Sequence, residues 1–125
     1  MDESESNTEL RQQIRQIASS FGMFECVSCA NAIQSYLVAR GIRGKQVRLH
    51  TGSARGKYGN IYHDGLQRNI STNGRHVAIA LEVGGQEMMF DNIHPEGILR
   101  QVWTSSFHCL AVELGSHFEV DEIEF

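Results

Sequence analysis

The feature that most constrains the fold is a pair of adjacent glycines between two segments rich in β-forming residues. Residues 75–83 read RHVAIALEV, and residues 86–93 read QEMMFDNI, with Gly84 and Gly85 between them. Two consecutive glycines allow the positive φ angles that a two-residue hairpin turn requires. The pattern therefore predicts an antiparallel β-hairpin and a fold that contains a sheet.

The register of this hairpin places a histidine and an aspartate on one face. Counting outward from the glycine turn, Ala78 lies opposite Asp91. Because side chains alternate between faces, His76 and Asp91 are diagonal neighbours on the same face, about 7–8 Å apart. Asn92 projects from the other face, and a slip of one residue would exchange the two. The hairpin thus offers Asp91 to orient His76, with Asn92 as the alternative orienting residue.

The N-terminal third predicts two amphipathic helices. Apolar residues recur at helical spacing between residues 8 and 21. A second helix is expected from about Cys26 to Arg40, with Gly41 as a left-handed C-cap. The residues that it is expected to bury are Cys29, Ala30, Ile33 and Leu37.

The remaining segments predict short strands and connecting loops. Residues 45–51 (KQVRLHT) and residues 109–114 (CLAVEL) are read as short strands. Residues 52–74 are rich in Gly, Asn and Ser and predict a long loop. A short helix is expected after Pro95. This order of elements predicts an α+β fold with N-terminal helices packed on a small antiparallel sheet.

Composition limits the class of protein. The chain has 125 residues, which predicts a single domain, placed at residues 8–125 after a disordered acidic tail at residues 1–7. A net charge of −4 argues against a nucleic-acid partner, and no apolar run approaches the roughly 20 residues of a membrane span. The acidic N-terminus lacks the features of a signal peptide. Three cysteines without such a signal argue against a disulfide framework.

Two cysteines three residues apart open the second predicted helix. A thiol at a helix N-terminus lies at the positive end of the helix dipole, which lowers its pKa. A neighbouring imidazole would lower it further and accept the proton. Cys26 on a helix, His76 on a strand and Asp91 on the next strand would supply a nucleophile, a base and an orienting group.

The sequence leaves other roles open. Free cysteines are commonly buried as packing residues, and we interpret Cys109 as a core or interface residue. The two cysteines of the helix could instead form half of a zinc site or a dithiol redox pair. His63 and Asp64 are the alternative base and orienting group. The remaining ligands of such a zinc site could come from His50, His63, His94 and His108.

Three separated segments carry a family resemblance: FECVSCANAIQSYLVARGI, GKYGNIYHDGLQRNISTNGRH and FDNIHPEGILRQVW. In this order they resemble the papain-fold toxin domain 2 family, the C-terminal domains of bacterial polymorphic toxins, over about residues 8–107. The resemblance implies a papain-like cysteine-enzyme fold with a triad of Cys, His and Asp or Asn. It also implies a protein substrate in a target cell and a cognate immunity protein as partner.

The resemblance leaves a choice between two nucleophiles. Papain peptidases carry CGSCW with the second cysteine catalytic, and CVSCA in this chain is similar, which points to Cys29. Bacterial transglutaminase-like proteins carry one cysteine at the helix start and a Gly-Ile pair beyond the helix, which fits Cys26 and Gly41-Ile42. Because the dipole effect fades within the first turn, we favour Cys26 and keep Cys29 as the alternative.

The expected function is acyl transfer on a protein amide by a delivered toxin domain that acts in the target-cell cytoplasm. Water would resolve the acyl-enzyme in a peptidase or a glutamine deamidase, and an amine would resolve it in a transglutaminase. No cofactor, metal, nucleic acid or membrane partner is expected. The alternative from another class is a non-catalytic binding module, with or without a structural zinc ion.

A stretch of basic residues follows the second predicted helix. Its members are Arg40, Arg43, Lys45, Arg48, Arg55 and Lys57. We read it as solvated surface, with a landing site for an acidic partner such as an immunity protein as the functional alternative.

Overall fold

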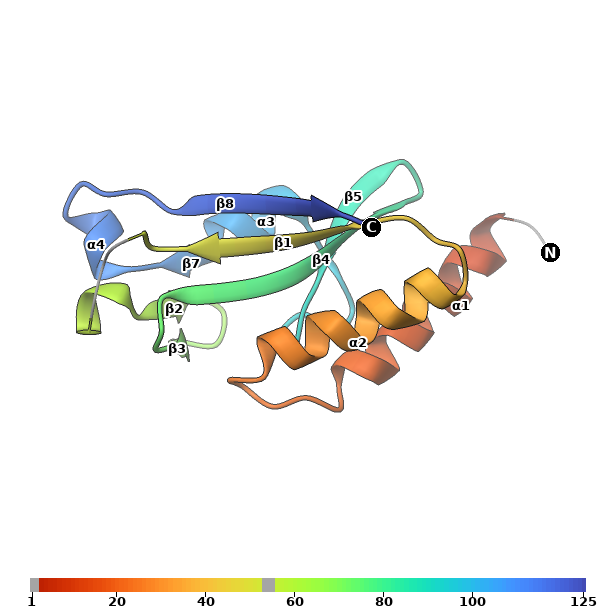
Figure 1. Ribbon diagram of the computed structural model, residues 1–125, viewed down its shortest axis with the longest axis horizontal. Helices are drawn as coiled ribbons and strands as arrows, with labels where there is room; N and C mark the ends of the chain where they lie inside the picture. Colours follow the sequence, from red (N-terminus) through yellow and green to blue (C-terminus); the bar gives the residue numbers. More distant parts are fainter. Residues whose placement is uncertain (1–2, 53–55) are drawn as a thin grey trace.

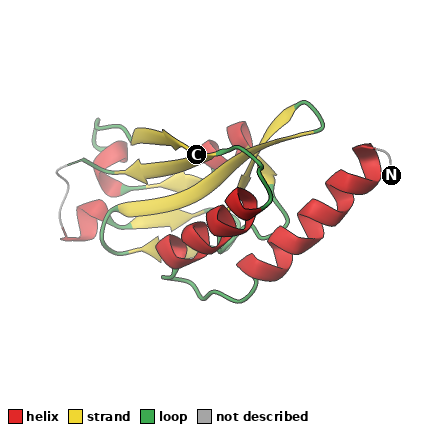
Figure 2. Cartoon of the chain, turned by 45° about the vertical axis from the view of Figure 1, so that its right-hand side comes forward, coloured by secondary structure: helices red, strands yellow, loops and turns green. Residues whose placement is uncertain are grey.

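The computed structural model describes residues 3–52 and 56–125. Two helices, α1 (Glu3–Ala18) and α2 (Cys26–Ala39), pack against one face of an antiparallel sheet (Figures 1 and 2). In spatial order its strands are β6 (Ile98–Leu99), β5 (Gln86–Phe90), β4 (Arg75–Val83), β1 (Lys45–His50) and β8 (Glu119–Glu124). The α+β fold with N-terminal helices on an antiparallel sheet is confirmed.

The predicted hairpin is present in the predicted register. Val83 pairs with Gln86 and Ile79 pairs with Phe90, which continues to Ala78 opposite Asp91. Gly84 and Gly85 have φ angles of 61° and 82°, values that residues other than glycine rarely adopt. The two glycines therefore set the turn, and the turn sets the register of the whole hairpin.

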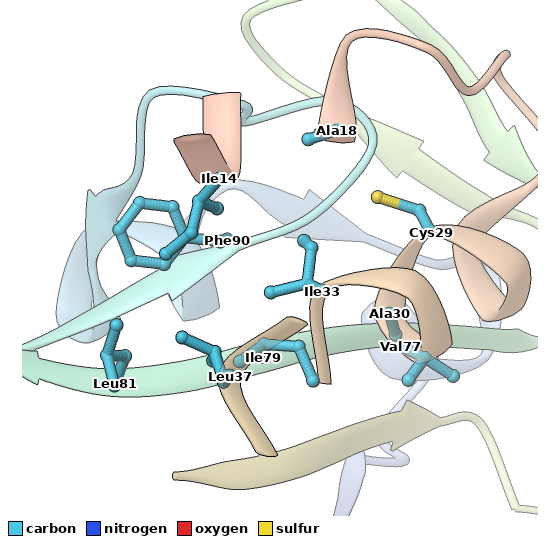
Figure 3. Close-up of a cluster of buried hydrophobic side chains, with 10 residues drawn as sticks. All are labelled: Ile14, Ala18, Cys29, Ala30, Ile33, Leu37, Val77, Ile79, Leu81 and Phe90. Carbon is cyan, nitrogen blue, oxygen red and sulfur yellow. The ribbon is translucent and has the colours of Figure 1, made fainter. Parts of the chain in front are cut away.

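β4 is buried on both faces, because a layer of side chains covers each face of the sheet. Its odd-numbered residues Val77, Ile79 and Leu81 contact a cluster that includes Ile14 of α1 and Phe90 of β5 (Figure 3). All four residues that the sequence analysis expected α2 to bury are in this cluster: Cys29, Ala30, Ile33 and Leu37.

The other face of the sheet packs against α3 (Arg100–Ser105) and a second, three-stranded sheet. The strands of this small sheet are β3 (Arg68–Ser71), β2 (Ile61–His63) and β7 (Phe107–His108). Ala78 and Ala80 of β4 contribute to a cluster in which Trp103 is fully buried. The small side chains of the two alanines leave room for this large ring.

Two local predictions were wrong. Residues 52–74 are not one loop: they include the 3-10 turn η1 (Gly56–Gly59), β2 and β3, whereas residues 53–55 lie outside the described part. Ile61 and Ile70 are buried in the same cluster as Trp103, and this packing holds the two short strands in place. Residues 109–114 contain the helix α4 (Leu110–Glu113) rather than a strand, and the acidic C-terminal segment pairs with β1 as β8 instead.

The helix ends differ slightly from the sequence expectation. α1 begins at Glu3, within the segment expected to be a disordered tail at residues 1–7. Gly41 has a φ of 70° and follows the end of α2, as predicted. None of the helices in the described part of the chain is long and apolar enough to span a membrane.

Candidate active site

His76 and Asp91 meet at the open end of the hairpin. His76 is the second residue of β4, and Asp91 directly follows the last residue of β5. Nε2 of His76 lies 2.8 Å from Oδ2 of Asp91, and both side chains are fully buried. The structure therefore brings together the two residues that the hairpin register placed on one face.

The Asp91 carboxylate is surrounded by hydrogen-bond donors. Oδ2 also accepts a bond of 2.8 Å from Nε1 of Trp103. Oδ1 accepts bonds from the backbone N–H groups of Ile93 (3.1 Å) and His94 (2.6 Å), and Nδ1 of His94 lies 2.9 Å from it. Indole and backbone N–H groups can only donate. Asp91 is therefore an ionised carboxylate, and His76 carries a proton on Nε2.

The pKa values of this pair follow from its contacts. Burial raises the pKa of Asp91, but its bonds with His76 and His94 outweigh burial and hold that pKa well below the usual range. Burial lowers the pKa of His76, whereas its interactions with Asp91 and Cys26 raise it to about 9. His76 is consequently an imidazolium at neutral pH.

Cys26 lies at the start of α2 and interacts with the His76 imidazole. Nε2 of His76 is bonded to Asp91, which leaves Nδ1 as the ring nitrogen available to the thiol, and Nδ1 has no hydrogen-bond partner within the described residues. Burial raises the pKa of the Cys26 thiol, but His76 and the backbone N–H of Val77 outweigh it and lower this pKa. Cys26 and His76 thus favour a thiolate–imidazolium pair.

The N-terminus of α2 adds to this effect. Glu25 is at the N-cap position, but its side chain makes no capping bond. Instead, Oε1 of Glu25 accepts a bond of 2.7 Å from the backbone N–H of Gly22. The first turn of α2 contains no acidic residue, so no carboxylate of that turn offsets the positive end of the helix dipole beside Cys26.

Cys29 has a different environment. It is fully buried in the cluster between the helices and the sheet (Figure 3). Burial, with the charge of Asp91, raises the pKa of its thiol to about 12. Cys29 is therefore a protonated packing residue, and the geometry favours Cys26 over the alternative nucleophile.

Asn92 is not placed to orient His76. Its Nδ2 donates to the backbone carbonyls of Gly22 (2.7 Å) and Met23 (2.9 Å), in the loop that leads into α2. Adjacent residues of the hairpin thus have separate contacts: Asp91 holds the imidazole, and Asn92 holds the loop before the cysteine.

The other candidates named from the sequence are not brought to Cys26. Nε2 of His63 lies 3.0 Å from Nε2 of His94, and Asp64 bonds to His108 instead of His63. Cys109 is buried, as expected, and its thiol donates to the carbonyl of Tyr58. Within the described residues, no group of three or more His, Cys, Asp or Glu side chains could hold a metal ion.

Part of the basic stretch is already paired. Nζ of Lys45 lies 3.9 Å from Glu87 and 3.6 Å from Glu122. Arg55 and the side chain of Lys57 lie outside the described part of the chain. The stretch therefore offers less unpaired charge to an acidic partner than its sequence indicates.

Sequence reasoning missed the roles of Trp103 and His94 at this site. Trp103 is the only tryptophan of the chain, and it lies in the predicted short helix after Pro95. A tryptophan in a buried helix face needs a partner for its N–H, and Asp91, predicted on the same face as His76, was an available acceptor. His94 was considered only as a zinc ligand.

Comparison with known proteins adds one finding. The family model described as papain fold toxin 2 matches residues 9–108, a span that includes Cys26, His76 and Asp91. Neither the curated proteins nor the solved structures gave a match.

Replacing Trp103 with phenylalanine tests the role of its N–H. Trp103→Phe keeps an aromatic ring but removes one donor from a buried carboxylate, so we expect a loss of stability of about 1–3 kcal/mol. Urea unfolding followed by circular dichroism measures it. Met89→Leu, a substitution in the same cluster that does not touch Asp91, is the control. If Trp103→Phe loses no more stability than Met89→Leu, the hydrogen bond from Trp103 to Asp91 is not the contact that stabilises the carboxylate.

The raised pKa of His76 predicts a dependence of stability on pH. The ordinary histidine pKa is about 6.5, and the folded protein raises it to about 9. The stability that His76 contributes is therefore fully present below about pH 6.5 and is lost as the pH rises towards the folded pKa, with a slope of up to about 1.4 kcal/mol per unit.

This dependence should be measured in Cys26→Ala, because the thiol beside His76 also titrates. In this variant Asp91 is the remaining group that raises the pKa of His76, so we expect a smaller slope. We expect the unfolding free energy of Cys26→Ala to fall between neutral and alkaline pH. The double variant Cys26→Ala/His76→Gln should lose this slope, and parallel curves for the two proteins would show that Asp91 does not raise the pKa of His76.

Proposed function

The chain belongs to the papain fold toxin 2 family, and on this premise we propose that it is a cysteine-dependent enzyme that acts by acyl transfer on an amide of a target-cell protein. Membership of the family makes it a papain-like toxin domain. The proposed nucleophile is Cys26, the proposed base is His76, and Asp91 is proposed to orient the base.

One observation carries this proposal. Cys26 at the start of α2 interacts with His76, and Nε2 of His76 is held 2.8 Å from Oδ2 of Asp91. Because Nε2 bonds to the carboxylate, Nδ1 is the ring nitrogen proposed to exchange the proton with the sulfur. This is the arrangement that an activated thiol nucleophile needs.

In the first step, the Cys26 thiolate attacks the carbonyl carbon of the amide. A carbon–sulfur bond forms, and the carbonyl oxygen takes the electron pair of the broken π bond. Cys26 is the first residue of α2, so its backbone N–H has no acceptor within the helix and is a donor to this oxyanion. The His76 imidazolium then gives its Nδ1 proton to the amide nitrogen. The oxyanion re-forms the carbonyl as the carbon–nitrogen bond breaks, so an amine or ammonia leaves and a thioester remains on Cys26.

In the second step, an acceptor resolves the thioester. Nδ1 of His76, now unprotonated, takes a proton from the attacking group, the carbon–sulfur bond breaks and the thiolate forms again. Water as acceptor gives a carboxylic acid, so the enzyme is a peptidase or a glutamine deamidase. A primary amine as acceptor gives a new amide and a transglutaminase. We favour hydrolysis and keep amine transfer as the alternative.

The partners and location are part of the same proposal. A toxin domain of this kind meets its protein substrate in the cytoplasm of the target cell and is held inactive in the producing cell by a cognate immunity protein. Both statements are what the resemblance to toxin domains implies.

Growth of a bacterial host that expresses the chain tests the proposal. We expect the unaltered chain to arrest growth, and we expect Cys26→Ala and His76→Gln to relieve the arrest because each removes a group of the proposed chemistry. Cys29→Ala is the matched control, since it alters a cysteine one turn away in the same helix and should still arrest growth. Equal arrest by the unaltered chain and Cys26→Ala would contradict the proposed enzyme.

A further inference from the structure

Two further histidines continue the hydrogen bonds of the site away from Cys26. His94 follows β5, and its Nδ1 lies 2.9 Å from Oδ1 of Asp91. Its Nε2 lies 3.0 Å from Nε2 of His63 on β2. Nδ1 of His63 in turn accepts a bond of 3.1 Å from the backbone N–H of Leu66. The contacts form a chain from Leu66 through His63 and His94 to Asp91.

The first member of this chain sets its direction. A backbone N–H can only donate, so Nδ1 of His63 is an acceptor and the proton of this ring is on Nε2. That proton is donated to Nε2 of His94, which therefore carries its own proton on Nδ1 and donates it to Asp91. Each ring is neutral, and each contact has one donor and one acceptor.

We propose that His94 and His63 are positioning residues for the nucleophile: their hydrogen-bonded chain fixes the Asp91 carboxylate, which in turn holds His76 for proton exchange with Cys26. This inference rests on the proposed function and adds two residues to it. Neither histidine is proposed to touch the substrate.

The packing around the two rings supports a fixed arrangement. His63 is 7% exposed, and the side chain of His94 is 11% exposed. Both rings pack against Phe107, with centroid distances of 5.6 and 6.2 Å, and Phe107 also packs against His76 at 5.2 Å. The small sheet thereby supports the orienting aspartate through β2 and β7.

The hydrogen-bonded chain from Leu66 to Asp91 also predicts that the site is sensitive to acid. Only one proton fits between the two Nε2 atoms, so a second proton on His94 would oppose the proton of His63, and a proton on Nδ1 of His63 would oppose the N–H of Leu66. Burial lowers the pKa of His63, and the neighbouring His94 and His76 lower it further, whereas Asp91 and Asp64 oppose this effect. A second proton on His63 would therefore break this hydrogen-bonded chain and place positive charge close to the His76 imidazolium.

The first test is the tautomer of each histidine, measured by long-range proton–nitrogen NMR of the full chain at neutral pH. We expect a proton on Nε2 alone in His63 and on Nδ1 alone in His94. A proton on Nε2 of His94, or a positive charge on either ring at neutral pH, would overturn the chain.

The second test is the rate at which iodoacetamide alkylates Cys26, followed by mass spectrometry from acidic to neutral pH. His94→Leu removes the donor to Asp91, and we expect its rate at neutral pH to fall by about tenfold, the factor that corresponds to one unit of pKa. His94→Asn, whose amide can take the place of Nδ1 but cannot be protonated, should restore the rate and keep it to lower pH than the unaltered chain. A merely structural role would leave the pH dependence unchanged.

His108→Leu is the matched control. His108 lies on the neighbouring strand β7 and bonds to Asp64, which is not part of the hydrogen-bonded chain. It should alkylate as the unaltered protein does. If Cys26 reacts but His94→Leu keeps the same rate and pH dependence, the positioning role is wrong while the proposed function stands. If Cys26 of the unaltered chain does not react at neutral pH, the proposed function fails, and the tautomers alone decide whether the two histidines hold Asp91.

Discussion

The buried carboxylate of Asp91 is the constraint on which the rest of the site depends. A buried charge is strongly unfavourable unless hydrogen bonds replace its water, and here these bonds come from several parts of the fold. His76 donates from β4, Trp103 from α3, and Ile93 and His94 from the turn after β5. The sheet, the short helix and the turn must therefore all be in place before the carboxylate is satisfied, which couples the stability of the fold to the geometry of the site.

The charge of Asp91 has consequences that reach the cysteine. It stabilises the His76 imidazolium, and the imidazolium stabilises a thiolate on Cys26. The next residue, Asn92, fixes the carbonyls of Gly22 and Met23 ahead of α2. One turn of the chain after β5 thus orients the proposed base through one residue and positions the loop before the nucleophile through the next. Burial and the same carboxylate raise the pKa of Cys29, whereas His76 and the backbone N–H of Val77 lower the pKa of Cys26, so the two thiols differ chemically although they share a helix.

Local patterns in the sequence predicted the parts of the site that depend on short-range geometry. The glycine pair determined the hairpin register and hence the His76–Asp91 contact, and helical spacing identified the buried face of α2. The contact of Trp103 with Asp91 depends on where α3 packs, and no local pattern encodes that position. The pairing of β8 with β1 joins segments far apart in the chain, and β2 and β3 are too short to show a strand period. Long-range packing, rather than local preference, decides these elements.

The central claim is that Cys26 is a thiolate at neutral pH because Asp91 keeps His76 protonated. The most direct measurement is the pH dependence of thiolate ultraviolet absorbance, taken as the difference between the unaltered chain and Cys26→Ala. The account predicts a thiolate signal at neutral pH with a midpoint well below the ordinary thiol value of about 8.5, and a shift of that midpoint to higher pH in Asp91→Asn. A signal that forms only at or above the ordinary value in the unaltered chain would contradict the account.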